Sequence, residues 1–354
     1  MHYALRIRHF AFIMTPIMVL LLLACGQRQE PLSSQPKPTA DDTFDLAQIE
    51  RAGELIALTL SGPDTYYDYQ GRHLGLHYLL CEQFASHLGV KLRMEVCRDT
   101  SEMLQRLTDG DADLIAVRMD VDTLAAGWRI GQGKPLLAQA LDDWYSPAML
   151  SEMKQKERAL LTQPRVQRRV FAPMLSRGVI SRYDALFKTY ARTCNWDWRL
   201  IAAQCYQEST FDPEAKSWAG ACGLMQIMPG TADHLGLSRD LLTDPEANIE
   251  AATRYIKELE GELSFVHNRY ERQNFVLAAY NGGLNHVRDA MRLTKRDGLN
   301  DQLWADVRQY ILKLAEPRYY QDTLVHHGYM RGTETADYVD KIRLRYQKYK
   351  RSVR

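Results

Sequence analysis

The sequence of 354 residues lacks an excess of charge and the loops that bind nucleotides or metals. Its 45 basic and 44 acidic residues give a formal net charge of +1, so nothing indicates electrostatic binding to nucleic acid. It contains no Walker-type or GxGxxG loop, no zinc-spaced cysteine cluster and no HExxH motif. We therefore expect no nucleotide, no nucleic-acid partner, no metal and no other cofactor.

The apolar run at the N-terminus, Phe10–Ala24, is shorter than the roughly 20 residues that a membrane-spanning helix needs. It follows Arg6 and Arg8, so it has the basic and apolar parts of a secretory signal. Its end, Leu-Leu-Ala-Cys25, resembles a bacterial lipoprotein box. The resemblance implies that Cys25 is the lipidated first residue of the mature protein, and that Gly26 after it is compatible with sorting to the outer membrane. A plain signal anchor with an incidental cysteine is the alternative.

The next residues are rich in Gln, Pro, Ser, Thr and Asp and cannot bury a core, so they indicate a flexible tether. The chain beyond it is long enough for two domains. We expect an α+β multidomain protein with a signal peptide at 1–25, a tether at 26–50, an α/β lobe at 51–150, a helical linker at 151–180 and an all-helical domain at 181–350.

In the first domain, apolar strand patterns alternate with helical ones. This order predicts parallel strand pairing with right-handed crossovers. The segments Gly-Glu-Leu-Ile-Ala (53–57) and Asp-Gly-Asp-Ala-Asp-Leu-Ile (109–115) resemble the first lobe of type-2 periplasmic solute-binding domains. Because 51–150 is too short for the two lobes of that family, we expect a single lobe that serves as a spacer or docking module. Binding of a solute stays open. The strands are expected at 55–60, 90–96 and 113–117, and the helices at 76–88 and 100–110.

The second domain has helical periodicity and clear helix ends. Asp197 precedes one helix, and the triplets Asp212-Pro213-Glu214 and Asp244-Pro245-Glu246 each have the order of an N-cap, a first-turn proline and a first-turn acid. A further helix, 274–281, is expected to stop at two glycines. The tail at 338–349 is predicted to be helical.

Glu208 continues the apolar stripe of Ile201 and Cys205 at the end of the helix that Asp197 begins. Burial and the negative end of the helix dipole both favour the protonated carboxyl and predict a raised pKa. A general acid for a glycosidic oxygen needs such a group. A buried structural acid bonded to the amides of the next loop has the same spacing, and the residues alone leave the choice open.

Four ordered motifs resemble soluble-lytic-transglycosylase domains, which have a goose-lysozyme-like fold. They are Glu208-Ser209, the block from Ser217 through Gly223-Leu-Met-Gln-Ile-Met-Pro229, Ala279-Tyr-Asn281, and Glu334-Thr-x-x-Tyr-Val339. Together with the lipoprotein box and the solute-binding-like lobe, they resemble the membrane-bound members of that family. The resemblance implies cleavage of the β-1,4 bond between N-acetylmuramic acid and N-acetylglucosamine in peptidoglycan strands, with 1,6-anhydro products, by a protein lipid-anchored to the outer membrane and facing the periplasm.

The resemblance also implies that Glu208 is the only acid/base, because the sugar's own C6 hydroxyl replaces the second carboxylate of ordinary glycosidases. Six residues would bind substrate around it. The serine would bond Glu208, the glutamine and methionine would line the sugar site, and the tyrosines would bound the cleft. Core packing, or a helix stop for the asparagine, is the alternative for each. The six are Ser217, Gln226, Met228, Tyr280, Asn281 and Tyr338.

Two other functions remain open. One is a muramidase in which Asp212 or Asp244 activates water, and the other is a peptidoglycan-binding or sensing lipoprotein without catalysis. The sequence leaves partner proteins of cell-wall synthesis or division, endo or exo action, stem-peptide preference and oligomeric state undetermined.

The cysteines after the signal suit a compartment that permits disulfides. Their spacing is compatible with the pairs Cys205–Cys222 and Cys81–Cys97, which would leave Cys194 free. Sequence alone does not establish the connectivity.

Overall fold

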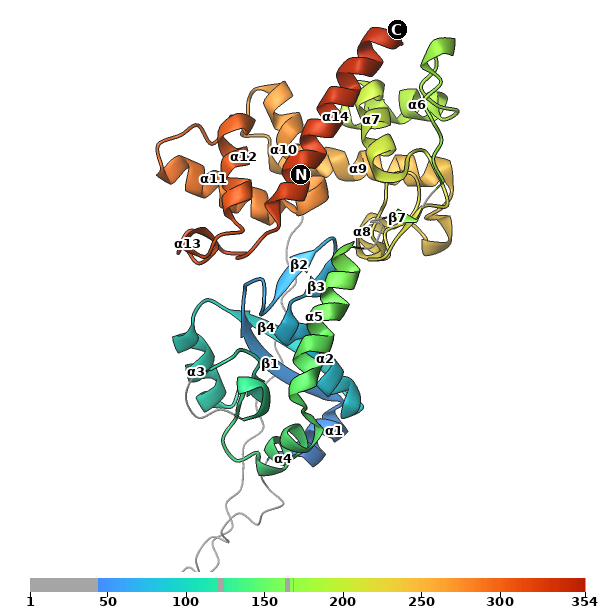
Figure 1. Cartoon of the computed structure of the whole chain (residues 1–354). Coiled ribbons are helices and arrows are strands. Elements are labelled where there is room, and N and C mark those ends of the chain that lie inside the picture. Colours follow the sequence, from blue (N-terminus) through green and yellow to red (C-terminus); the bar gives the residue numbers. More distant parts are fainter. Residues whose placement is uncertain (1–43, 120–123, 163–165, 168, 354) are drawn as a thin grey trace, which may run out of the picture. The chain divides into compact units, whose positions relative to one another are not determined.

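The structure is a computed structural model that describes residues 44–119, 124–162, 166–167 and 169–353 (Figure 1). The predicted signal peptide, Cys25 and residues 26–43 of the predicted tether lie outside these residues, whereas its last residues are not a flexible tether, because the helix α1 (Leu46–Ala52) begins there. An α/β lobe comes first in the described chain and a largely helical region follows, which confirms the predicted fold class. None of the described helices is both long and apolar enough to cross a membrane.

The lobe is built on a four-stranded sheet in the order β4–β1–β5–β6. The central strand β1 runs parallel to β4 and to β5, as predicted from the alternation of strands and helices. The edge strand β6 pairs antiparallel with β5 and was not expected from the sequence. The strands are β1 (Glu54–Leu60), β4 (Lys91–Cys97), β5 (Leu114–Ile115) and β6 (Arg129–Ile130).

Helices cover both faces of this sheet. Leu55 and Ala57 of β1 join the apolar cluster that contains the buried side chains of α2, whereas Leu58 joins the cluster of α3. Successive side chains of a strand point to opposite faces, so these two helices lie on opposite sides. Figure 1 shows α2 and α5 side by side. The helices are α1 (Leu46–Ala52), α2 (Leu76–His87), α3 (Thr100–Asp109), the single turn η1 (Ala125–Gly127), α4 (Pro135–Trp144) and α5 (Pro147–Thr162).

A tight hairpin, β2 (Tyr67–Tyr69) and β3 (Arg72–Leu74), projects from the lobe. Its two turn residues, Gln70 and Gly71, have φ angles of 52° and 75°. Two consecutive left-handed residues match the type I′ turn, whose twist suits a two-residue hairpin. Nothing in the sequence pattern predicts this hairpin, because type I′ turns favour Asn-Gly or Asp-Gly.

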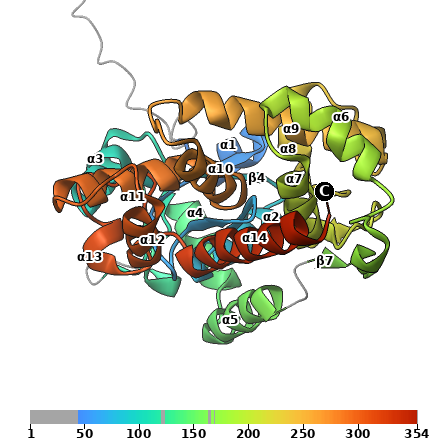
Figure 2. The ribbon, with the colours of Figure 1, turned by 90° about the horizontal axis from the view of Figure 1, so that it is seen from above.

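The helical region has one continuous apolar core. Its last helix, α14, packs beside α7, α10 and α12 (Figure 2). The elements are β7 (Val166–Gln167), η2 (Leu175–Arg177), α6 (Asp184–Cys194), α7 (Trp198–Ser209), β8 (Lys216–Ser217), α8 (Pro229–Leu235), η3 (Arg239–Leu241), α9 (Pro245–Glu262), α10 (Arg269–Gly282), α11 (Leu284–Arg296), α12 (Trp304–Lys313), α13 (Pro317–Tyr320) and α14 (Gly332–Ser352). The segment predicted as a helical linker is helical up to Thr162 and continues through β7 and η2.

Two of the three predicted aspartate caps are found. Asp197 accepts a hydrogen bond from the Arg199 N–H at 2.9 Å, and Asp244 accepts one from the Ala247 N–H at 2.8 Å. The third prediction is wrong, because no helix begins at Asp212. Its carboxylate instead accepts the N–H groups of Arg169, at 2.6 Å, and Glu214, at 3.2 Å. The helix expected at 274–281 begins earlier, at the start of α10.

The two compatible disulfide pairs are not formed, since all five described cysteines are free thiols. Cys81 belongs to the apolar cluster on the α2 side of the sheet and Cys97 to the cluster on the α3 side, so the sheet separates them. The Cys205 thiol donates to the Leu224 carbonyl at 3.3 Å, and the Cys222 thiol to the Gly220 carbonyl at 3.4 Å.

The carboxyl end of β1 is covered by a segment of the helical region. Ser61 follows β1 and its Oγ accepts a hydrogen bond from the Tyr329 N–H at 2.8 Å. Gly328 packs so closely on Ser61 that a β-carbon there would collide with it. Open α/β sheets commonly bind ligands at this edge, and here the chain itself occupies part of it.

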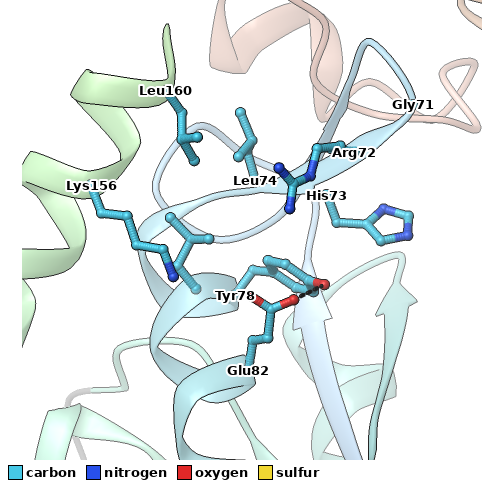
Figure 3. A pocket seen from close by; sticks show the side chains of 9 residues that line it. Gly71, Arg72, His73, Leu74, Tyr78, Glu82, Lys156 and Leu160 are labelled. Carbon is cyan, nitrogen blue, oxygen red and sulfur yellow. Dashed lines mark hydrogen bonds between the residues drawn. The ribbon is translucent and has the colours of Figure 1, made fainter. Parts of the chain in front are cut away.

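A pocket of about 270 Å³ lies elsewhere on the lobe, between β3, α2 and α5 (Figure 3). Arg72, Glu82 and Lys156 line it and are exposed. Tyr78 also lines it and donates to Glu82 at 3.1 Å. A site with such exposed walls buries little of a small ligand, whereas small-molecule sites usually bury most of it.

We predict that the lobe does not bind a small solute tightly. The chain from residue 44 onward, which keeps Tyr329 and Gly328 over the sheet edge, should give no saturable heat in calorimetric titrations with amino acids or free stem peptides. The reasons are the covered sheet edge and the open walls of the remaining pocket. Saturable binding at micromolar concentration of either ligand class would contradict this prediction.

Candidate active site

Glu208 lies in the last turn of α7, and its side chain is only 3% exposed. Leu200 and Ile201 of the same helix are fully buried, so the acid continues an apolar face as predicted. After the helix, Thr210 and Phe211 have φ angles of 52° and 62°. Non-glycine residues rarely adopt this left-handed conformation. The chain therefore makes a sharp turn at Thr210 and Phe211, immediately after the helix that carries the buried acid.

The hydroxyl of Tyr338 donates a hydrogen bond to Glu208 Oε1 at 2.5 Å. Tyr338 lies in α14 and is 1% exposed, so both partners are buried. A carboxyl group taken out of water needs such a partner to offset lost hydration. This bond brings together two of the residues that the motifs indicated.

Arg343 fixes α14 against α10 one and a half turns after Tyr338. Its buried guanidinium donates to Asn274 Oδ1 and, at 2.8 Å, to the Tyr270 carbonyl. A charge-assisted, buried group of this kind sets the position of a helix firmly. Sequence reasoning missed Arg343, although a lone arginine among apolar helix positions is a signal that could have found it.

The loop from Ser217 to Met228 is held by backbone and amide hydrogen bonds. Ser217 Oγ accepts from the Ala221 N–H at 2.9 Å. Asn248, fully buried on α9, accepts from the Met225 N–H at 2.8 Å and donates to the Leu242 carbonyl at 2.7 Å. Asn248 was also missed, although it follows the Asp244 cap by four residues on an apolar face.

Gly223 is required where the loop passes this asparagine. Its φ angle is 82°, and a β-carbon would collide with the Leu242 carbonyl and the Asn248 amide. No other residue combines that conformation with that close approach. The glycine of the motif is thereby explained by the position of the loop.

Gln226 and Met228, predicted to line the sugar site, differ in placement. The Gln226 amide is buried and donates to the carbonyls of Ala215, at 3.0 Å, and Gly223, at 2.9 Å. Met228 precedes α8 and is half-buried. Gln226 thus stabilises the loop by hydrogen bonds, whereas the Met228 side chain is partly exposed to solvent.

Tyr280 and Asn281 lie at the end of α10. The Tyr280 hydroxyl donates to the Met225 carbonyl at 2.8 Å. Burial, and after it the nearby Glu208 carboxylate, raise the pKa of Tyr280 well above its ordinary value, so it remains a neutral donor. Asn281 Oδ1 accepts from the Thr335 hydroxyl at 2.9 Å, which ties this helix end to the first turn of α14.

The predicted site residues are thus assembled around Glu208 to different degrees. Tyr338 contacts the acid directly, and Tyr280 is close enough to interact with its charge. Ser217 and Gln226 make bonds within their own loop, so their contacts with substrate stay predictions. A pocket of about 220 Å³ opens beside Tyr338, lined also by Trp218 and by residues of α14 and the β2–β3 hairpin.

Residues 185–302, which include Glu208 and Tyr280, match the family model described as the transglycosylase SLT domain. These residues are thus similar to an SLT domain. The domain match starts inside α6 and ends before α12, so α14 with Tyr338 lies beyond it.

Relatives of this chain include enzymes named membrane-bound lytic murein transglycosylase F. That of Citrobacter koseri is 29% identical over 417 aligned positions, covering 84% of this chain and 80% of the relative. That of Saccharophagus degradans is 26% identical, covering 84% and 82%. The predicted resemblance to lytic transglycosylase enzymes is confirmed. Since 84% of a 354-residue chain cannot fill 417 positions, the first relative has internal residues that this chain lacks.

Among solved structures, this chain is similar to the 70 kDa soluble lytic transglycosylase of Escherichia coli, with 30% identity and a TM-score of 0.32. The match covers 48% of this chain and 24% of that one. A complex of the 70 kDa enzyme with bulgecin A matches at 31% identity, a TM-score of 0.32 and the same coverage.

We predict that Tyr338→Phe lowers turnover on peptidoglycan by about ten- to a hundredfold, because it removes a hydrogen bond to the buried acid. The matched control is Tyr349→Phe on the same helix, since the buried Tyr349 hydroxyl has no hydrogen-bond partner among the described residues. That variant should keep full activity. Rates on purified sacculi, with melting temperatures for both variants, test this; equal rates for the two would refute it.

Proposed function

We propose that this protein cleaves the β-1,4 bond between N-acetylmuramic acid and N-acetylglucosamine and leaves 1,6-anhydromuramic ends, with Glu208 as the single acid and base. The observation that carries the proposal is the buried Glu208 carboxyl bonded by Tyr338. The match to the SLT model and the names of the relatives support the same reaction class.

The proposed reaction starts from protonated Glu208. Tyr338 donates to Oε1, so we assign the transferable proton to the other carboxyl oxygen, Oε2. That proton moves to the O4 atom of the leaving N-acetylglucosamine as its bond to C1 of the muramic sugar breaks. A placed acid of this kind can protonate the leaving oxygen as the bond breaks.

The second step closes the sugar on itself. Glu208, now a carboxylate, accepts the proton of the C6 hydroxyl while O6 forms the bond to C1. Glu208 is thereby protonated again, and the reaction consumes no water molecule. Tyr280 stays neutral beside the changing charge because of its raised pKa. Tyr338 can donate to the carboxylate throughout, which stabilises the ion between the two steps.

The geometry favours this reaction over the water-using alternative. That alternative needs a second acid to activate water, and the sequence offered Asp212 and Asp244. Asp212 is bonded by the N–H groups of Arg169 and Glu214, and Asp244 caps α9. A catalytic base at either position would have to break these structural hydrogen bonds.

We propose further that Cys25 is lipidated and anchors the protein to the outer membrane, with the active site facing the periplasm and its peptidoglycan strands. The relatives are named membrane-bound, which supports attachment to a membrane. Two or more acyl chains make such attachment stable, since each buried methylene contributes about 0.8 kcal/mol.

The reaction predicts that Glu208→Gln abolishes turnover while folding and glycan binding persist. One group serves both proton transfers, so the loss should reach or exceed the ~10²–10⁴-fold effect of a placed acid. Glu214→Gln, at an exposed acid of the following loop, is the matched control and should remain active. Mass analysis of digested sacculi should give wild-type products one water lighter than hydrolysis products. Reducing muramic ends, or activity in Glu208→Gln, would disprove the mechanism.

The anchor predicts that Cys25→Ala is not acylated and is lost from the membrane fraction, while Cys222→Ala is acylated like the wild type. A form that begins at residue 44 should be soluble and active, because the tether carries no catalytic group. Metabolic labelling with a fatty acid and membrane fractionation measure both effects. Acylation that persists in Cys25→Ala would show that the lipoprotein box was misread.

A further inference from the structure

The tip of the β2–β3 hairpin has an unfavourable conformation. Gln70 has a φ of 52°, in a turn type that favours asparagine, aspartate or glycine at this position. Such strain persists only where the surroundings hold it, and it gathers at functional sites. Contacts of its side chain hold Gln70 in this conformation.

The hairpin tip is held by a carboxylate of α14. Gln70 Nε2 donates to both oxygens of Glu334, at 2.6 and 2.7 Å. The hydroxyl of Tyr69 donates to Glu334 Oε2 at 2.5 Å. Glu334 lies one helical turn before Tyr338, on the same side of α14. The hairpin is therefore tied to the helix that carries the partner of Glu208.

The same tip contacts two further segments of the candidate active site. The Tyr69 ring stacks on Trp218, the neighbour of Ser217, with centroids 6.0 Å apart and an angle of 27°. Gly71 packs so closely on the side chain of Met228 that a β-carbon at residue 71 would displace it. Hairpin residues thus reach two of the motifs that the family resemblance assigned to the sugar site, the block Ser217–Pro229 and the segment Glu334–Val339.

These contacts form one side of the pocket of about 220 Å³ beside Tyr338, which is open to solvent. Aromatic rings, an amide and charged groups line it together, which is the mixture that binds the apolar faces and polar substituents of a sugar. Six of the lining residues supply these groups: Tyr69, Gln70, Trp218, Glu334, Tyr338 and Lys341.

We propose that this pocket, with Tyr69 and Gln70 as its outer wall, binds one N-acetylated hexosamine of the glycan strand beyond the residues at the cleaved bond. The inference rests on the proposed function. It assigns to the α/β lobe a part in substrate binding: the hairpin adds a sugar subsite to the cleft of the helical region. Glycans long enough to reach the pocket bind through the hairpin, and shorter ones do not.

The test replaces Gln70 by glycine, which accepts the turn conformation and removes the side chain that forms part of the outer wall. Ala126→Gly is the matched control, because Ala126 is another non-glycine residue of the lobe with positive φ, at 62°, and its side chain does not line the pocket. Both changes are made in the Glu208→Gln protein, and binding of muramic–glucosamine oligosaccharides from disaccharide to octasaccharide is measured by calorimetry. Melting temperatures report folding.

Gln70→Gly should weaken binding of the longest oligosaccharides by about tenfold, the effect of one hydrogen bond to a polar partner, and leave the disaccharide unchanged. Ala126→Gly should bind every length like its parent. A loss that is equal at all lengths, or no loss, would overturn the subsite and leave the proposed function intact. If the protein with Glu208 cleaves no glycan, the proposed function fails, and the binding series still decides the subsite by the same criterion.

Discussion

The hydrogen bond between Tyr338 and Glu208 joins residues 130 positions apart, so the rest of the site has to hold both side chains in place. A buried carboxyl is tolerated only with a partner, so α7 and α14 have to meet at this point. Arg343 holds α14 on α10, and Thr335 bonds Asn281 at the end of the same helix. The acid is thus positioned by contacts from across the helical region.

The same helix receives the α/β lobe. Glu334 accepts from Gln70 and Tyr69 of the hairpin, one turn before Tyr338. Any shift of the hairpin therefore acts on the first turn of α14, close to the bond with Glu208. A strained glutamine is an unusual choice for a hairpin turn, and its amide reaches a carboxylate that the favoured shorter asparagine reaches less readily.

The sequence predicted the elements whose causes are local. Asp197 and Asp244 cap helices with N–H groups two and three residues ahead, and the strand and helix patterns of the lobe were read from periodicity. Asp212 has the same local pattern but bonds the Arg169 N–H, 43 residues away, so no helix begins there. Gln70 depends on Glu334, 264 residues away, and no local pattern predicts that hairpin. Glu208 was predicted from the apolar stripe that it continues on its helix. Its partner Tyr338 was predicted only from the family resemblance.

The resemblance of the α/β lobe to solute-binding domains stays a prediction, and the contacts of its sheet edge bear on what the lobe can bind. Two-lobed traps enclose a solute by closing one wall on another, and this chain lacks internal residues present in its longer relative. The helical region fills part of the vacant side, since Tyr329 and Gly328 cover Ser61 at the carboxyl end of β1. A lobe held at its ligand edge gains little from hinge closure, but its fixed hairpin can serve as a wall for a neighbouring cleft. The lobe contacts the candidate active site through Glu334 of α14 and through Trp218.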